Sequence, residues 1–181
     1  MRQIAARPNA QALYGDGAYR ARVSVAAKRG CRVGRLATPA HMRDMMRAMA
    51  YWLLKTEPST YSFADLVKAK ETRWDGIENP AALKLMKSAS VGDRALIYHT
   101  GDEKSAVGEC EIVKAAYPDP KSERLVVIDV RAGKALKKPV SLAIIKRDPL
   151  FGDSPLVRQG RLSFVPITDA QWRRIHELAA L

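Results

Sequence analysis

Cysteine is scarce in this chain of 181 residues, which contains only Cys31 and Cys110. The two cysteines form no CxxC motif and stand at no metal-type spacing from a histidine, so we expect neither a metal site nor a disulfide framework. Cys110 lies in an apolar run, where we expect a buried and unreactive thiol. This cysteine usage suits a reducing compartment, and we expect a cytoplasmic protein.

Long apolar stretches are missing as well. No run is long enough to span a membrane, and the first residues lack the uninterrupted apolar region of a secretory signal. We therefore expect no membrane partner.

Acidic residues are rare in the first part of the chain. Residues 1–48 contain 10 Lys/Arg and 2 Asp/Glu, a balance of +8, whereas residues 49–181 contain 21 and 17, a balance of +4. Strong positive charge usually indicates a polyanionic partner. Because most of the net charge of +12 lies in residues 1–48, the partner of the remaining chain has to be argued from its own residues.

Residues 1–48 also lack a sustained helical or strand period. Three interpretations are open: a basic, disordered arm that touches phosphates, an Arg-rich transit peptide, or sequence that precedes the true translation start. Four methionines cluster at the boundary, and ordered patterning begins directly after the last of them, Met49. We favour a disordered or non-native extension over residues 1–48 and a single domain over residues 49–181.

From Met49 onward, short apolar and β-branched runs alternate with turn residues, which is typical of strands. The expected strands cover residues 51–55, 93–100, 105–115, 125–131, 135–140 and 162–167, with a strand or turn at 73–76 and a turn at 117–120. Four residues have the side chains and spacing of helix N-caps. They are Ser62, Asn79, Ser141 and Thr168, ahead of helices over 63–70, 80–88, 142–146 and the C-terminal residues.

These elements predict an α+β fold, a compact and partly open β-barrel of five to six strands with short flanking helices. A doubly wound parallel sheet fits poorly, because the middle strands are not separated by helices. Residues 148–160 are expected to form a loop.

Familiar catalytic motifs are absent. The chain has no GxSxG, no phosphate-binding glycine loop, no HExxH, and no HxE followed by PCxxC. His41 lies in the basic extension, and His176 is expected on the solvated side of the last helix. His99 ends a strand beside Tyr98, where a structural or binding role is favoured over catalysis. We expect no enzymatic activity, no cofactor and no metal.

The triplet Lys55-Thr56-Glu57 has residue types that can activate a nucleophile. Neighbouring strand residues point to opposite faces, however, so the three side chains do not converge by default. The simpler interpretation is that Lys55 and Glu57 share one face as an ion pair.

Two aromatic residues are candidate stacking surfaces for a ligand. Trp52 and Trp172 fit a core, since one lies in an apolar strand and the other on a helix stripe. Trp74 lies in a turn-like stretch, where we expect an exposed ring on which a base stacks with about 1–3 kcal/mol. Tyr98, at a strand end, is a second candidate wall.

A polar cluster precedes the last strand. Arg158, Gln159, Arg161 and Ser163 crowd a loop that apolar neighbours tie to the core. Arginine forks suit phosphates and base edges, and glutamine can bind an amide-like base edge. The cluster favours a binding role.

Taken in order, several short motifs across residues 49–181 resemble the EVE domain family. They are Tyr51-Trp-Leu-Leu-Lys-Thr-Glu-Pro-Ser59, Trp74-Asp-Gly76 with Asn79, Val91-Gly-Asp93, Tyr98-His99, Ala116-Tyr-Pro-Asp-Pro120, Leu156-Val-Arg-Gln159 and Arg161-Leu-Ser163. The resemblance implies a PUA-like barrel that encloses one base, often a modified one, in a pocket with aromatic walls. It implies DNA or RNA with a modified base as the partner of a monomeric domain.

Carried over position by position, the resemblance implies a pocket lined by nine residues with two more at its edge. The lining residues are Trp74, Asp75, Asn79, Tyr98, His99, Arg158, Gln159, Arg161 and Ser163, and the edge residues are Lys55 and Glu57. The chain departs from the family after Trp74-Asp-Gly76: the usual Arg, Gln and Arg are Glu78, Ala81 and Leu83. Loss of two cations and gain of one anion should weaken phosphate binding at the Asn79 helix start and flatten its salt dependence.

Three functions remain in view. A non-catalytic reader of a modified base leads. A hydrolase of a modified nucleoside is the alternative, by fold-level analogy to PUA-like relatives of the ASCH type. An adaptor that binds protein comes last, because no long exposed apolar helix supports it.

Overall fold

The computed structural model describes residues 7–8 and 49–181. The expectations for the N-terminal extension, including Cys31 and His41, therefore fall outside the described residues, apart from Arg7–Pro8.

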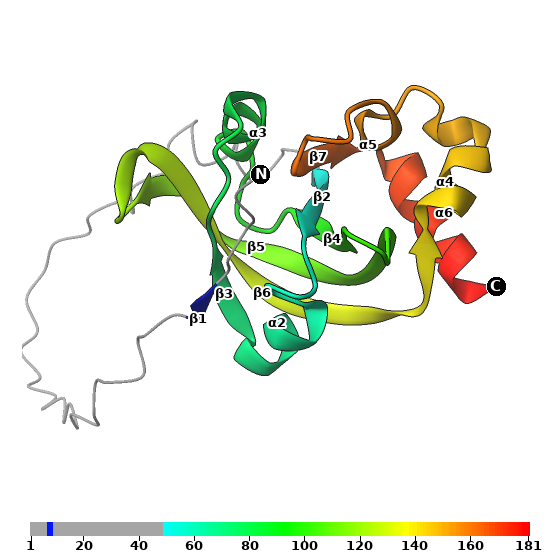
Figure 1. Cartoon of the computed structure of the whole chain (residues 1–181), viewed down its shortest axis with the longest axis horizontal. Helices are drawn as coiled ribbons and strands as arrows, with labels where there is room; N and C mark the ends of the chain where they lie inside the picture. The colour runs from blue at the N-terminus through cyan, green and yellow to red at the C-terminus, as the bar shows by residue number, and fades with distance from the viewer. Residues whose placement is uncertain (1–6, 9–48) are drawn as a thin grey trace, which may run out of the picture. The chain divides into compact units, whose positions relative to one another are not determined.

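The described residues form short helices around one β-sheet (Figure 1). In chain order the elements are β1 (Arg7–Pro8), β2 (Tyr51–Thr56), α2 (Phe63–Ala69), β3 (Glu71–Trp74), α3 (Pro80–Met86), β4 (Arg94–His99), β5 (Ser105–Asp119), β6 (Ser122–Ser141), α4 (Leu142–Arg147), the 3-10 helix η1 (Pro149–Phe151), α5 (Pro155–Arg158), β7 (Phe164–Ile167) and α6 (Asp169–Ala180).

The sheet is mixed and has the strand order β1-β3-β6-β5-β4-β2-β7. The β2–β4 pair is parallel, and the other pairs are antiparallel. Among the described residues, β1 and β7 do not pair with each other, so the sheet stays open. The expected α+β class with a partly open sheet and short helices is confirmed.

The first predicted strand is the buried centre of one half of the sheet. Residues Trp52 to Leu54 of β2 are almost fully buried between β4 and β7. The carboxylate of Asp93, itself buried, accepts hydrogen bonds from the Ala50 amide (3.1 Å), the Trp52 indole N–H (3.0 Å) and the Ser90 amide (2.9 Å). Asp93 therefore fastens the start of β2 beside the start of β4.

Where the sequence indicates three strands between residues 105 and 140, the structure has two long ones, β5 of 15 and β6 of 20 residues. A turn does join them, at Pro120–Lys121, but the rest of the turn expected at residues 117–120 belongs to β5, which extends to Asp119. Several register shifts interrupt the β5–β6 ladder, and such bulges bend a strand without ending it. At one of them Gly108 faces Phe63, whose ring would lie 2.3 Å from a Cβ on residue 108. Only glycine lets the ring pack there.

The helix starts follow the predicted caps. Ser62 and Asp65 form a complete capping box on α2, and Thr168 and Gln171 form another on α6. Such a cap contributes about 0.5–2 kcal/mol. The Asp148–Gly160 segment was expected to be a loop but contains η1 and α5, each with a proline at its first helical position.

The core confirms two further expectations and corrects one. Cys110 is buried, and its burial raises the pKa of the thiol, so it stays protonated. Trp172 and Ile175 of α6 are buried as expected. His176 is half-buried rather than fully solvated, because it lies one helical turn after Trp172 and its ring packs against the Trp172 ring with centroids 4.9 Å apart.

Helix α3 lies across the open side of the sheet. It contacts β7, at one edge of the sheet, and β6, next to the other edge strands. It therefore spans the opening of the sheet, and the loop that precedes it faces the loop that precedes β7. Within the described part of the chain, no helix is both long and apolar enough to cross a membrane.

Candidate functional site

A cleft of about 740 Å³ lies where α3 meets the open side of the sheet. Four segments line it: the end of β2, the loop before α3, the turn after β4 and the loop before β7. The lining residues are Lys55, Thr56, Glu57, Gly76, Ile77, Glu78, Asn79, Thr100, Gly101, Gly160, Arg161, Leu162 and Ser163. Its volume is within the range of small-ligand pockets, about 300–1,000 Å³.

Lys55 is the buried cation of this cleft, with 6% of its surface exposed. Its ammonium donates to the carbonyl of Gly160 at 3.1 Å and lies 6.0 Å from the centre of the Tyr98 ring. Burial lowers the pKa of Lys55 to about 8. An ammonium has three donors, so the Gly160 bond leaves donors for a ligand.

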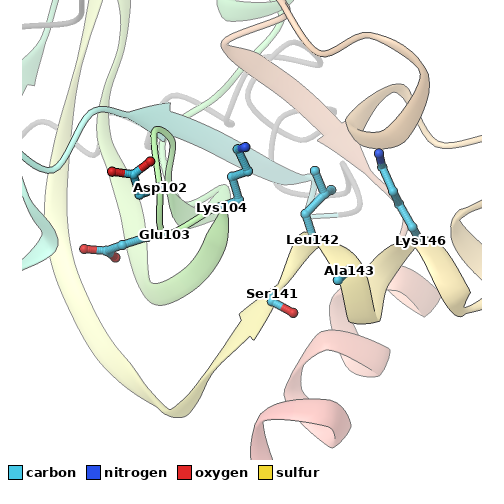
Figure 2. Close-up of a pocket in the computed structure, with 7 residues that line it drawn as sticks. All are labelled: Asp102, Glu103, Lys104, Ser141, Leu142, Ala143 and Lys146. Carbon is cyan, nitrogen blue, oxygen red and sulfur yellow. The ribbon is translucent and has the colours of Figure 1, made fainter.

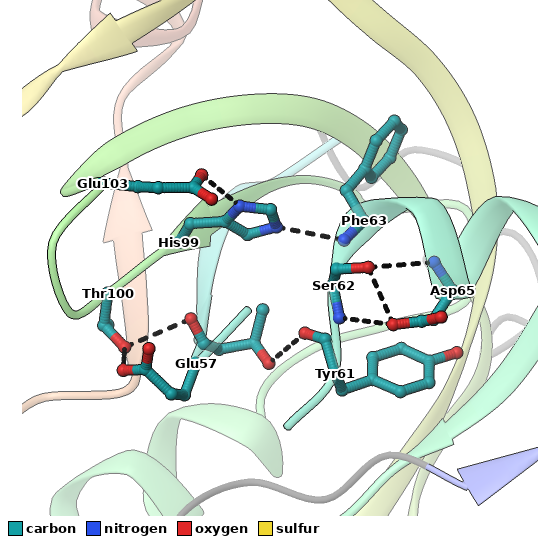
Figure 3. A network of polar contacts seen from close by, with 9 residues as sticks. Glu57, Tyr61, Ser62, Phe63, Asp65, His99, Thr100 and Glu103 are labelled. Carbon is teal, nitrogen blue, oxygen red and sulfur yellow. Dashed lines mark hydrogen bonds and ion pairs between the residues drawn. The ribbon is translucent and has the colours of Figure 1, made fainter. Parts of the chain in front are cut away.

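Glu57 lies two residues further along the same face but does not pair with Lys55. No ion pair joins Lys55 to a carboxylate anywhere in residues 49–181, so the expected Lys55–Glu57 pair is wrong. Instead, the Thr100 hydroxyl lies 2.8 Å from Glu57 Oε2 (Figure 3). The turn after β4 holds the carboxylate apart from the ammonium.

Three other predicted residues also reach the cleft: Asn79, Arg161 and Ser163. Asn79 Oδ1 accepts hydrogen bonds from the amides of Ala81 (2.9 Å) and Ala82 (3.3 Å), so it already occupies the first amides of α3. Arg161 is exposed at the rim. The cleft therefore brings together five of the eleven predicted residues.

Trp74 is not the exposed ring that we expected. It is the last residue of β3, points inward, and is 0% exposed. Its ring meets Tyr61 edge-on, with centroids 6.4 Å apart. The aspartate and glycine that follow suggested a turn, but the strand continues through Trp74 and its two-residue period places Thr72 and Trp74 in the core. Among residues 49–181, no aromatic ring lines the cleft.

Tyr98 and His99 are buried behind the cleft rather than exposed in it. Desolvation raises the pKa of Tyr98 to about 12. His99 Nε2 accepts a hydrogen bond from the Phe63 amide at 3.0 Å, and its Nδ1 lies 2.6 Å from Glu103 (Figure 3). This histidine joins the start of α2 to the β4–β5 turn, which is the structural role.

The remaining predicted residues also lie outside the cleft lining. The guanidinium of Arg158 donates to the Gly152 carbonyl at 3.0 Å and pairs with Asp153. Gln159 is the C-cap of α5. Asp75 is buried and pairs with Lys121 at 3.2 Å.

The structure adds cleft residues that the sequence argument did not single out: Ile77, Thr100, Gly101, Gly160 and Leu162. Ile77 and Leu162 are buried apolar residues in the lining of the cleft. The position of Gly101 shortly after a predicted strand was the one sequence signal for a tight turn at this edge of the cleft. It has φ +64°, a conformation that favours glycine.

A second, smaller hollow of about 380 Å³ lies between the β4–β5 turn and the start of α4 (Figure 2). It is lined by Asp102, Glu103, Lys104, Ser141, Leu142, Ala143 and Lys146. None of the predicted site residues belongs to it. Its charges are mixed, and the Ser141 hydroxyl already accepts from the Ile144 amide at 3.4 Å.

An open mixed sheet, short helices and a polar cleft at the opening define a PUA-like α+β domain. The EVE domain family matches residues 50–178. The chain belongs to the EVE domain family.

Solved and curated relatives agree with this assignment. An NMR structure of a Rhodopseudomonas palustris protein is 38% identical, with a TM-score of 0.70 over 73% of this chain and 94% of that chain. Human thymocyte nuclear protein 1 is 27% identical over 75% of this chain and 76% of that protein. A structure of the human THYN1 protein in complex with DNA that contains 5-methylcytosine is 24% identical, with a TM-score of 0.65 over 73% of this chain and 98% of that chain.

Proposed function

We propose that this protein is a reader of modified DNA, which holds one extruded 5-methylcytosine in the cleft at the open side of the sheet. Support comes from the EVE family membership and from the human relative that was solved with 5-methylcytosine DNA. The observation that carries the proposal is the cleft itself, where a buried ammonium and a carboxylate face a volume of about 740 Å³.

The chemistry of the lining suits a single base. Its apolar lining residues are the buried Ile77 and Leu162, in place of the aromatic walls we expected. Lys55 and Glu57 offer a donor and an acceptor for its edge. Arg161 at the rim can stack on a base or bind a flanking phosphate. Because extrusion from a duplex costs a few kcal/mol, single-stranded or mismatched sites should bind more tightly.

The test compares the full chain on fluorescent oligonucleotides that differ only by one central 5-methylcytosine in place of cytosine. Dissociation constants are measured by anisotropy at fixed salt, because charge-driven binding depends on ionic strength. The ratio of the two constants is the readout, since the basic residues 1–48 contribute equally to both. We expect tighter binding of the modified strand; equal constants would refute the proposal. A matched RNA pair, measured alongside, decides whether DNA is preferred.

We also propose that binding occurs without turnover and as a monomer. In support, the Thr56 hydroxyl is buried and donates to the Tyr61 carbonyl at 2.8 Å, so it is not presented to Lys55 as a nucleophile. Incubation with acylated and methylated nucleosides, followed by chromatography, tests this. A product that forms with the parent chain but not with Lys55→Met would establish the hydrolase instead.

A further inference from the structure

Glu57 occupies an unusually well-defined position at the end of β2. Its carbonyl accepts hydrogen bonds from the amides of Thr60 and Tyr61, both at 2.9 Å. The neighbouring Thr56 hydroxyl donates to the Tyr61 carbonyl at 2.8 Å. These hydrogen bonds hold the turn that follows β2 and fix the backbone of Glu57.

The side chain of Glu57 is also held by specific contacts. Thr100 Oγ1 lies 2.8 Å from Oε2 (Figure 3). The carboxylate also lies next to Gly101. A Cβ on residue 101 would lie 2.5 Å from Oε1 and 3.0 Å from Oε2. A side chain at residue 101 would therefore push the flexible Glu57 carboxylate aside, and the φ of +64° is a backbone conformation that favours glycine.

The carboxylate keeps acceptor capacity toward the cleft. No cation in residues 49–181 forms an ion pair with Glu57. An ionised carboxylate accepts at about four positions, so the Thr100 hydroxyl satisfies only part of it. Two residues away on the same face, the Lys55 ammonium can only donate. The end of β2 therefore presents one acceptor and one donor to the cleft, each anchored by a different partner.

We propose that Glu57 selects the class of base, by accepting a hydrogen bond from the exocyclic amino group of a cytosine-type base while Lys55 donates to its ring acceptors. This rests on the proposed function. Cytosine carries an amino donor where thymine carries the O4 acceptor. With thymine, the O4 acceptor would face the Glu57 carboxylate, and two acceptors that oppose each other without a proton between them disfavour the complex.

The matched ligands for the test are 5-methylcytosine and thymine in the same single-stranded sequence. Both carry the 5-methyl group; they differ at position 4 and in the proton on N3. We expect the full-length parent to bind the 5-methylcytosine strand about ten- to a hundredfold more tightly than the thymine strand. In Glu57→Gln the amide can donate as well as accept, so this preference should fall at least about threefold, and the part that remains reflects the N3 proton of thymine, which faces the Lys55 ammonium.

Two further variants separate the role of Glu57 from a general loss of folding. Gly101→Ala keeps the carboxylate but displaces it, and it should lower the same preference. Asp102→Asn removes one negative charge from the same turn outside the cleft and should leave the preference unchanged. Circular dichroism of each variant at the assay temperature confirms that the compared proteins are folded.

The outcomes distinguish this inference from the proposed function. A parent that prefers 5-methylcytosine to cytosine but binds thymine equally well would overturn the role of Glu57 and leave the reader function standing. Retention of the full preference by Glu57→Gln would overturn it too. A parent with equal dissociation constants for the 5-methylcytosine and cytosine strands, but much weaker binding of thymine and uracil strands, would refute recognition of the methyl group. The same result would support Glu57 as the residue that selects the base.

Discussion

The buried ammonium of Lys55 should make ligand binding depend on pH in the mildly alkaline range. With a pKa of about 8, the charged fraction falls from about nine-tenths at pH 7 to about one-tenth at pH 9. If only the ammonium donates to the base, affinity for a 5-methylcytosine strand falls about tenfold between these two pH values. Ordinary lysines, with pKa values of about 10.4, contribute little to this change.

The measurement is an anisotropy titration of the full chain at pH 7, 8 and 9 with constant ionic strength. Lys55→Met is the matched variant, because it keeps the apolar stem and removes the charge. It should bind more weakly at pH 7 and show a flat profile. A flat profile for the parent, or an equal slope for parent and variant, would refute the role given to the ammonium.

Stability should change in the opposite direction, which separates lost binding from unfolding. The pKa of Lys55 is lowered from 10.5 to about 8 in the folded chain, so the unfolded chain holds more protons between these values and the Lys55 contribution becomes more favourable as pH rises. Lys55→Met lacks the cost of burying an ammonium. It should therefore be more stable than the parent at pH 7, by an amount that shrinks toward pH 10.

Three further predictions concern residues whose surroundings are defined. Arg161→Ala should weaken oligonucleotide binding measurably, because Arg161 lies at the rim of the cleft. Arg158→Ala should leave the dissociation constant within about twofold, because the Arg158 guanidinium bonds the Gly152 carbonyl away from the cleft. The reverse result would place the nucleic acid elsewhere on the domain. Gly108→Ala should cost about 1–3 kcal/mol of unfolding free energy in urea, since its Cβ meets the Phe63 ring; an unchanged midpoint would contradict this packing. Ser62→Ala should lose the α2 cap and about 1 kcal/mol, and a stability equal to that of the parent in the same assay would show that the capping box contributes nothing.

Much of the fold is predictable because its signals are local. The caps at Ser62 and Thr168 each require only a side chain and the amides of the next turn, so they can be recognised without knowledge of the tertiary structure. The apolar run of β2 and the Pro-Asp-Pro turn at residue 120 are equally local. The long β6 was missed because its continuity depends on bulges against β5, which no sequence period records.

The site was only partly predictable, because its contacts join residues that are far apart in the sequence. Lys55 and Glu57 follow from the end of a clear strand, but their separate partners, Gly160 and Thr100, come from distant loops. Trp74 was wrongly predicted to be exposed. A tryptophan beside a turn is exposed only if the preceding strand ends before it, and β3 includes Trp74 as its last residue. A Trp74→Ala variant would therefore test the core: removal of this ring should cost about 3–5 kcal/mol and would not isolate a binding effect.

The four segments around the cleft are far apart in the sequence, and each adjoins a different strand of the same sheet, namely β2, β3, β4 or β7. Lys55 and Glu57 at the end of β2 are bonded to Gly160 and Thr100 of two other segments, whereas Asn79 in the loop before α3 bonds only to amides of α3, so within residues 49–181 this loop is the segment that can change most freely. The unusual residues Glu78, Ala81 and Leu83 all fall within or just after one of these segments, the loop that leads into α3. Domains of this kind can therefore diverge in ligand preference one loop at a time, and chimaeras that exchange a single loop are the natural way to map which part recognises which portion of the nucleotide.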